Sequence, residues 1–325
     1  MRRINLHLFL GCLSLLLLPV AAIADMDGKL TLQHSTDAQT WSDIEITPDM
    51  IDEDGRLSLT GMPNPSFFRL DVTDFAASAA PEGMVLVEGG TLPASSELGA
   101  VDVATFYMGI HEVTWGEWQE VRAWGEANGY EWPGWAGGGC AADHPVHTVN
   151  WFDALKWSNA KSEMEGLTPV YTVSGAVFKT GQPDHKTISQ NLSANGYRLP
   201  LEAEWEFAAR GGNQTTGYTY AGSNDLNAVG WYLDNSGGAA CGEPWSGLER
   251  GTWPVGQKAS NELGLYDMSG NVWEWCWDQI DSYRSIRGGG WYDPAGSCTV
   301  SLRGNAGSVN RFDHYGFRLA RGSGN

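Results

Sequence analysis

Residues 261–278 of the chain read NELGLYDMSGNVWEWCWD, and the second half of this stretch decides the fold around it. From position 273 onward, indole side chains alternate with acidic or thiol side chains. The indoles are Trp273, Trp275 and Trp277, and the side chains between them are Glu274, Cys276 and Asp278. A period of two residues is typical of a β-strand with two different faces. We therefore predict a strand that packs its tryptophans on one face and directs the acids and the cysteine to the other.

The residues just before this strand form a turn that is rich in oxygen atoms. Asp267, Gly270 and Asn271 lie where the chain must turn, and they bring oxygen donors close to Glu274. Carboxylates together with backbone carbonyls are the ligands that calcium prefers. Two interpretations stay open: a turn that only leads into a core strand, or a turn that also binds a calcium ion.

The segment GLYDMSGNVWEW, residues 264–275, resembles the central motif of the formylglycine-generating, or sulfatase-modifying-factor, family. Further segments agree with that family in the same order along the chain. They are EVT at 112–114, RLP at 198–200 followed by EAEWE at 202–206, RGGGW at 287–291 and GFR at 316–318. Agreement in order argues against chance similarity, so the chain is identified as a member of this family.

The resemblance implies an α+β fold related to C-type lectins, with few helices, twisted sheets and long loops. The composition agrees with such a fold, because 42 glycines and 16 tryptophans suit a loop-rich chain that is held by aromatic packing. We expect this domain to occupy residues 83–322. Within it we predict a helix capped by Thr114 and Glu117, a second capped by Asn150, and a third at residues 201–210.

The N-terminal part has a different organisation. Residues 1–24 have the pattern of a signal peptide, because Arg2 and Arg3 precede an apolar run that ends in small residues. We therefore expect an exported protein, periplasmic or secreted, without a membrane-spanning segment. Alternating apolar residues and turn signals predict a small β module at residues 25–74, and residues 75–82 are the expected linker.

The formal net charge of the 325-residue chain is −19, which argues against a nucleic acid as partner because phosphates would be repelled. The charge names no other partner.

The resemblance also implies metal ligands. A calcium site of the family corresponds to the side chains of Asp267 and Glu274 and the carbonyls of Gly270 and Val272. Another calcium site, the first in the family's order, includes the positions of Asn227 and Ala228. Its completing aspartate is missing here, because residues 247–249 read GLE. Calcium is therefore the expected cofactor, and Asn227 is a doubtful ligand.

Family members that make formylglycine oxidise a cysteine of a sulfatase with copper and oxygen, and they need two cysteines five residues apart. In this chain Cys298 matches the second cysteine, whereas Asp293 stands at the first and Gly290 at the preceding serine. One thiolate and one hard carboxylate make a poor Cu(I) site. Cys298 and Asp293 are still the candidate catalytic residues, with copper expected only if the oxidase activity is retained.

Three functions stay open. The first is a divergent, exported member that binds a peptide, a protein such as a sulfatase, or a glycan in a substrate groove. The second is retained oxidation of a protein substrate, and the third is an unrelated activity that uses Asp293 with polar neighbours such as Arg303, Arg311 or His314. The expected substrate-binding residues are Trp291, whose indole we expect to be exposed, Tyr292 and Arg303.

Once the signal peptide is removed, four cysteines remain in an exported chain, and an even number favours disulfides. Four cysteines allow three pairings. We expect Cys276 to pair with Cys298, and Cys140 with Cys241.

Overall fold

The computed structural model describes residues 80–238 and 250–323, together with the backbone of four strands nearer the N-terminus. The chain divides into two compact units, Met1–Ala79 with the last residue and Ala80–Gly324.

The N-terminal unit contains one antiparallel sheet with the strand order β1-β4-β2-β3. Its strands are β1 (Leu8–Leu10), β2 (Lys29–Ser35), β3 (Ser42–Ile44) and β4 (Ser66–Thr73). β2 and β4 pair along their length, from Lys29 opposite Thr73 to Ser35 opposite Phe67. Because β1 lies inside the predicted signal peptide, we expect the mature sheet to consist of β4, β2 and β3.

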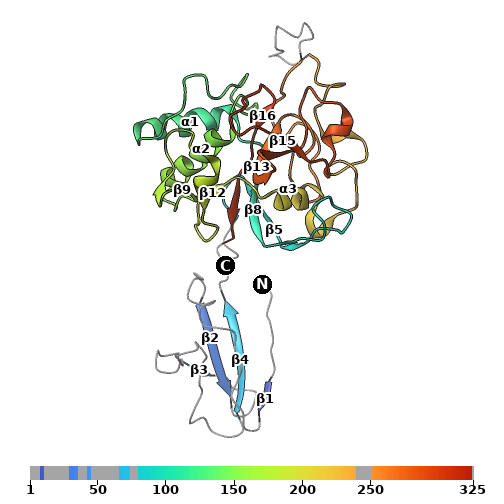
Figure 1. Ribbon diagram of the computed structural model, residues 1–325. Helices are drawn as coiled ribbons and strands as arrows, with labels where there is room; N and C mark the ends of the chain where they lie inside the picture. Colours follow the sequence, from blue (N-terminus) through green and yellow to red (C-terminus); the bar gives the residue numbers. More distant parts are fainter. Residues whose placement is uncertain are drawn as a thin grey trace. The chain divides into compact units, whose positions relative to one another are not determined.

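Two four-stranded sheets organise the large unit (Figure 1). The first has the order β12-β17-β8-β5, with strands β5 (Met84–Val87), β8 (Phe106–Gly109), β12 (Tyr197–Arg198) and β17 (Ala320–Gly322). The second has the order β15-β14-β13-β16, with strands β13 (Trp273–Ile280), β14 (Tyr283–Arg287), β15 (Gly304–Ala306) and β16 (Tyr315–Gly316). β17 pairs with β8, so the last strand of the domain lies in the same sheet as its early strands. The short strand β16 runs parallel to β13 and brings residues 311–315 beside the central stretch.

Smaller elements complete the unit. The remaining strands are β6 (Gly90–Thr91), β7 (Asp102–Val103), β9 (Tyr171–Val173), β10 (Ala176–Val177) and β11 (Ile188–Gln190). The short helices are η3 (His185–Thr187), η4 (Gly212–Gln214), α4 (Leu226–Val229) and η6 (Ala295–Cys298). Strands and helices are both present with long loops between them, which confirms the predicted α+β class. In the part of the chain that the structure describes, no helix is both long and apolar enough to span a bilayer.

The two longer helices begin where the sequence predicts. In α1 (Trp115–Ala127) the hydroxyl of Thr114 accepts a hydrogen bond from the backbone of Glu117, whose carboxylate in turn accepts from the backbone of Thr114. Asn150 and Asp153 form the same reciprocal box at the start of α2 (Trp151–Met164). Both predicted caps are therefore confirmed.

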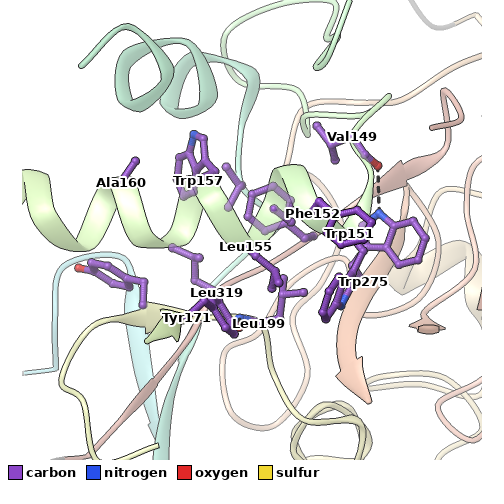
Figure 2. Packing of buried hydrophobic residues seen from close by; sticks show 14 of the residues in the cluster. Val149, Trp151, Phe152, Leu155, Trp157, Ala160, Tyr171, Leu199, Trp275 and Leu319 are labelled. Atoms are coloured by element: carbon purple, nitrogen blue, oxygen red, sulfur yellow. Dashed lines mark hydrogen bonds between the residues drawn. The ribbon is translucent and has the colours of Figure 1, made fainter. Parts of the chain in front are cut away.

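α2 lies in the centre of the larger hydrophobic core (Figure 2). Nearly all of its side chains are buried, including Trp151, Phe152, Leu155 and Trp157. The indole of Trp157 stacks on that of Trp118 in α1, with ring centroids 6.2 Å apart. Large aromatic rings therefore fill the space between the helices and the second sheet.

Strand β13 separates the two hydrophobic cores, as its alternation predicts. Trp273 and Trp275 are buried in the core around α2, and Nε1 of Trp275 donates a 3.0 Å hydrogen bond to the carbonyl of Val149 (Figure 2). Cys276 belongs instead to the core that contains Trp205 of α3 (Glu202–Ala209). The indoles and the thiol thus lie on opposite faces, and the prediction is confirmed.

α3 begins without a capping side chain at the preceding residue, Leu201. The carboxylate of Asp278 on β13 takes this role and accepts a 2.5 Å hydrogen bond from the backbone N–H of Glu202. The glutamates of α3 form buried ion pairs, Glu204 with Arg198, Glu202 with Arg287, and Glu206 with both Arg287 and Arg210. These contacts make the acidic run of α3 structural.

Candidate binding groove

The segment after β14 is a tight glycine turn. Gly288 and Gly289 have φ angles of 96° and 73°, which only glycine adopts without strain. A Cβ atom on Gly289 would lie 2.6 Å from Sγ of Cys298, so no side chain fits there. The turn therefore packs closely against Cys298.

Asp293 is held by hydrogen bonds at the end of this turn. Its Oδ2 atom accepts a 2.8 Å hydrogen bond from Nε1 of Trp273 and a 3.1 Å hydrogen bond from the backbone N–H of Gly290. Burial raises the pKa of the Asp293 carboxyl, although the bond from Trp273 and the nearby His314 oppose the shift. The carboxylate thus joins the turn to the central strand.

Cys298, which packs against Gly289 of the turn, is buried and free. It packs with Leu226, Val229 and Tyr232 in a small apolar cluster. Burial, with a contribution from the charge of Asp293, raises the pKa of the Cys298 thiol to about 12. At neutral pH this thiol is therefore protonated, whereas the thiolate is the form that binds a metal.

The predicted disulfide between Cys276 and Cys298 is wrong, because both thiols are free. The reason is the strand geometry: Cys276 points toward α3, and Cys298 is enclosed by a different apolar cluster. Cys241 lies outside the described residues, so its pairing with Cys140 stays a prediction.

Beside Asp293 the surface opens into a cavity of about 450 Å³. Its lining residues are Thr148, Trp291, Tyr292, Arg311, Phe312, Asp313 and His314. We call this cavity and its rim the 291–314 groove. Tyr292 and Phe312 are each 47% exposed at the rim. Trp291 is only 1% exposed and donates from Nε1 to the carbonyl of Asp313, so the prediction of an exposed Trp291 indole is wrong.

Exposed apolar side chains extend the rim. Val309 is exposed near the start of α2, where its carbonyl accepts from Asn150. Trp135, 69% exposed, lies with its ring centroid 5.9 Å from the guanidinium carbon of Arg311. Large exposed apolar residues that gather in one place mark an interaction site more strongly than single ones do.

The charges of the groove are partly neutralised from within. Arg311 forms a two-point ion pair with the buried carboxylate of Asp153, with N–O distances of 2.6 and 3.0 Å. Asp313 lies 3.0 Å from Nδ1 of His314, whose ring stacks on Phe312. Arg311 therefore serves first to anchor the 309–314 loop to α2.

Thr148 connects three loops at the base of the groove in a strained conformation. Its φ angle is 57°, which is rare for a β-branched residue. Its N–H donates to the carbonyl of Phe312, and its carbonyl accepts from Gly137. The hydroxyl shares a 2.9 Å hydrogen bond with His147, and burial lowers the pKa of His147 to about 4. Strain of this kind gathers at ligand sites.

The structure does not bring Arg303 into the groove. Its guanidinium makes two 2.8 Å hydrogen bonds to the carboxylate of Glu202 at the start of α3. Arg303 is therefore placed as a structural partner of Glu202.

The turn before β13 brings buried carboxylates together. Oδ1 of Asp267 and Oε1 of Glu112 are buried and have no hydrogen-bond partner. Burial raises the pKa of Asp267 to about 6, and burial together with Asp267 and Glu274 raises that of Glu112 well above its usual range. Arg318 donates to both oxygens of Glu274, at 2.6 and 2.7 Å, so its guanidinium is a buried structural partner of this carboxylate.

The predicted calcium ligands fit a cation in this turn only in part. Asp267 has a free buried oxygen, but Oε2 of Glu274 already accepts from both Arg318 and Trp205. Oε1 of Glu274 accepts one hydrogen bond and keeps one lone pair. No three His, Cys, Asp or Glu side chains of the described ranges converge as a ready metal cluster.

A family model described as the sulfatase-modifying factor enzyme 1-like domain matches residues 71–323. The chain belongs to this family. Its α+β fold is the C-type-lectin-like fold of sulfatase-modifying-factor proteins, as the sequence motifs predicted.

Two relatives and one solved structure document the similarity. Chaperone protein LppX of Paenibacillus barcinonensis is 36% identical over 263 residues, which cover 74% of this chain and 89% of LppX. Inactive C-alpha-formylglycine-generating enzyme 2 of Bos taurus is 36% identical over 139 residues, 40% of this chain and 45% of that protein. The crystal structure of CarF matches with a TM-score of 0.61 and 32% identity over 74% of this chain and 97% of CarF.

Sequence reasoning missed several residues of the groove in this sulfatase-modifying-factor domain. Phe312, Thr148 and Trp135 lie in three separate loops without periodicity. Aromatic residues in predicted loops were the available signal in the sequence, because loops lie at the surface and leave such side chains exposed.

Proposed function

We propose that this protein is a non-catalytic member of its family that binds an extended segment of another protein in the 291–314 groove. The observation that carries the proposal is a pair of adjacent features. The rim of the cavity exposes aromatic side chains, and beside the cavity Asp293 stands at the position that the family resemblance matches to a copper-binding cysteine. Tyr292, Phe312 and Trp135 offer broad apolar faces to a ligand. Aromatic residues contribute much of the binding energy at protein interfaces.

The residues at the oxidase position do not fit copper. Cu(I) prefers soft thiolate ligands, and the family's oxidases supply two. Here Asp293 is a hard ligand whose Oδ2 is engaged by Trp273 and Gly290, and Cys298 is protonated and buried. We therefore place no oxidative step at this site.

The relatives support a binding role. LppX is named a chaperone, and the bovine relative is named inactive. A chaperone-like role requires a surface that accepts apolar side chains of a partner, which the rim of the groove provides. The acidic balance of the chain, −19, favours a partner segment that is neutral or basic.

Two further properties belong to the proposal. A calcium ion held by Asp267, the carbonyls of Gly270 and Val272, and Oε1 of Glu274 would offset the buried negative charge of this turn. Its role would be structural. The signal-peptide pattern of residues 1–24 supports export, so we expect the partner outside the cytoplasm.

The test compares two ligand classes. A permanently unfolded, fluorescently labelled polypeptide and a labelled oligosaccharide are titrated with the full mature chain, and binding is followed by fluorescence anisotropy. We expect saturable binding of the polypeptide. Binding of the oligosaccharide alone would contradict the proposal.

A further inference from the structure

Residues 225–235 form the loop in which the family resemblance implies the first calcium site. Oδ1 of Asp225 accepts hydrogen bonds from the backbone and the side chain of Asn227 at the start of α4. The side chain of Asn235 donates a 2.9 Å hydrogen bond to the carbonyl of Gly230. Hydrogen bonds from its own polar side chains therefore hold the loop together.

The oxygen atoms expected to bind this calcium already have donors within the chain. The side-chain oxygen of Asn227 lies 3.4 Å from the hydroxyl of Tyr232 and 3.4 Å from the amide of Asn235. The carbonyl of Ala228 accepts a 3.0 Å hydrogen bond from the backbone N–H of Ala259. The carbonyl of Asn227 accepts a 2.9 Å hydrogen bond from Nζ of Lys258. Each of these oxygens has therefore given at least one lone pair to a donor of the chain, and together they offer less than the open set of oxygens that a calcium ion needs.

The ammonium group of Lys258 is held from a second side as well. It lies 3.9 Å from the ring centroid of Trp231, a distance at which the face of an indole attracts a cation. Trp231 in turn stacks on Trp253, with centroids 4.3 Å apart and ring planes within 8°. A carbonyl dipole and an indole face thus converge on one positive charge, which neutralises a loop that also carries Asp225 and Asp234.

We infer that the ammonium group of Lys258 is a built-in cation that takes the place of the first calcium ion of the family and holds residues 225–235 without a metal. This inference is independent of the 291–314 groove. It also gives a reason why the GLE segment at residues 247–249 can lack the aspartate of a calcium site, since the positive charge comes from the chain itself.

The test measures hydrogen exchange of the backbone amides of residues 225–235 by mass spectrometry. It uses the full mature chain with Asp267→Asn, which removes a ligand of the other proposed calcium site. We expect the same exchange rates with millimolar calcium and with a chelator. The additional change Lys258→Met removes the charge and keeps the length of the side chain. It should accelerate exchange in this segment at least ~10-fold, and calcium should not reverse the effect.

The matched control is Lys186→Met, a change of an exposed lysine in η3, which should leave residues 225–235 unaffected. Slower exchange of these amides in calcium, in the chain that retains Lys258, would overturn the inference. So would unchanged exchange in Lys258→Met. If Lys258→Met does not fold, native mass spectrometry of the Asp267→Asn chain decides: a specifically bound calcium ion overturns the inference, and its absence supports it.

Discussion

The indole of Trp273 donates a 2.8 Å hydrogen bond to the carboxylate of Asp293, the residue that the sequence motifs match to a copper-binding cysteine of the family's oxidases. Trp273 belongs to the strand that separates the two cores, so this bond joins the groove directly to the centre of the fold. Together with the hydrogen bond from the backbone N–H of Gly290, it fixes the turn that presents Tyr292.

The first prediction concerns copper. The wild-type chain should bind Cu(I) weakly and leave a cysteine-containing sulfatase peptide unchanged, because the pair of positions 293 and 298 supplies a single thiol, Cys298, which is buried and protonated. Asp293→Cys should raise Cu(I) affinity, measured by competition with a chromogenic chelator, since two thiols then lie at the family's spacing. Copper-dependent formation of the aldehyde by the wild-type chain, detected by mass spectrometry, would contradict this account.

The second prediction concerns the start of α3. Asp278→Ala should lower the free energy of unfolding by about 1–2 kcal/mol, because the N–H of Glu202 loses its acceptor. Asp278→Asn retains a side-chain oxygen and should lower it less. Denaturant unfolding measures both changes, with Gln279→Ala on the same strand as the control at an exposed site. Equal losses in Asp278→Ala and Gln279→Ala would show that Asp278 does not cap the helix.

The third prediction concerns pH and His147. Burial lowers its folded-state pKa to about 4 from an ordinary value of 6.5, with His144 and His314 acting in the same direction and Asp313 opposing them. The unfolded chain therefore takes up this proton first as the pH falls. The stability that His147 contributes is present above pH 6.5 and is lost progressively toward pH 4.

His147→Gln removes this titrating group, so the free energy of unfolding should depend less on pH. Between pH 7 and pH 5 the wild type should lose roughly 2 kcal/mol more of its free energy of unfolding than His147→Gln loses. Urea unfolding at the two pH values gives the comparison. Parallel pH profiles of the two chains would refute the prediction.

The fourth prediction concerns calcium at the turn before β13. Saturating calcium should raise the melting temperature of the wild type by about 5–10 °C over its value in a chelator. Asp267→Asn should abolish the difference, whereas Asp184→Asn, an exposed control, should preserve it. Glu274→Gln is the poorer test because it also disturbs the ion pair with Arg318. Identical melting curves with and without chelator would exclude this site.

The sequence alone predicted the features that depend on residues close together in the chain. The alternation around Trp275 predicts the strand and its two faces, because side-chain direction in a strand follows from position alone. Thr114 and Asn150 predict the starts of two helices, because each cap bonds to a residue three positions later. The ordered motifs supplied the fold class.

Contacts between distant loops could not be predicted in this way. The cap of α3 comes from Asp278, 76 residues beyond the N–H that it accepts. The groove combines the loops of Thr148, Tyr292 and Phe312, whose proximity depends on the parallel pairing of β16 with β13. The same limit explains the wrong cysteine pairing, since no local pattern places Cys276 and Cys298 in two different apolar clusters.

The central claim is that the 291–314 groove binds a protein segment through its exposed aromatic rim. The direct measurement is the affinity of the labelled unfolded polypeptide for the wild type and for two double variants, each of which replaces two exposed aromatic residues by serine. Tyr292→Ser with Phe312→Ser removes the rim, and Tyr218→Ser with Tyr283→Ser removes exposed aromatic residues outside the groove lining. We predict at least a ~10-fold loss of affinity for the first pair and wild-type affinity for the second, with both variants folded. Equal affinity of all three chains would contradict the account.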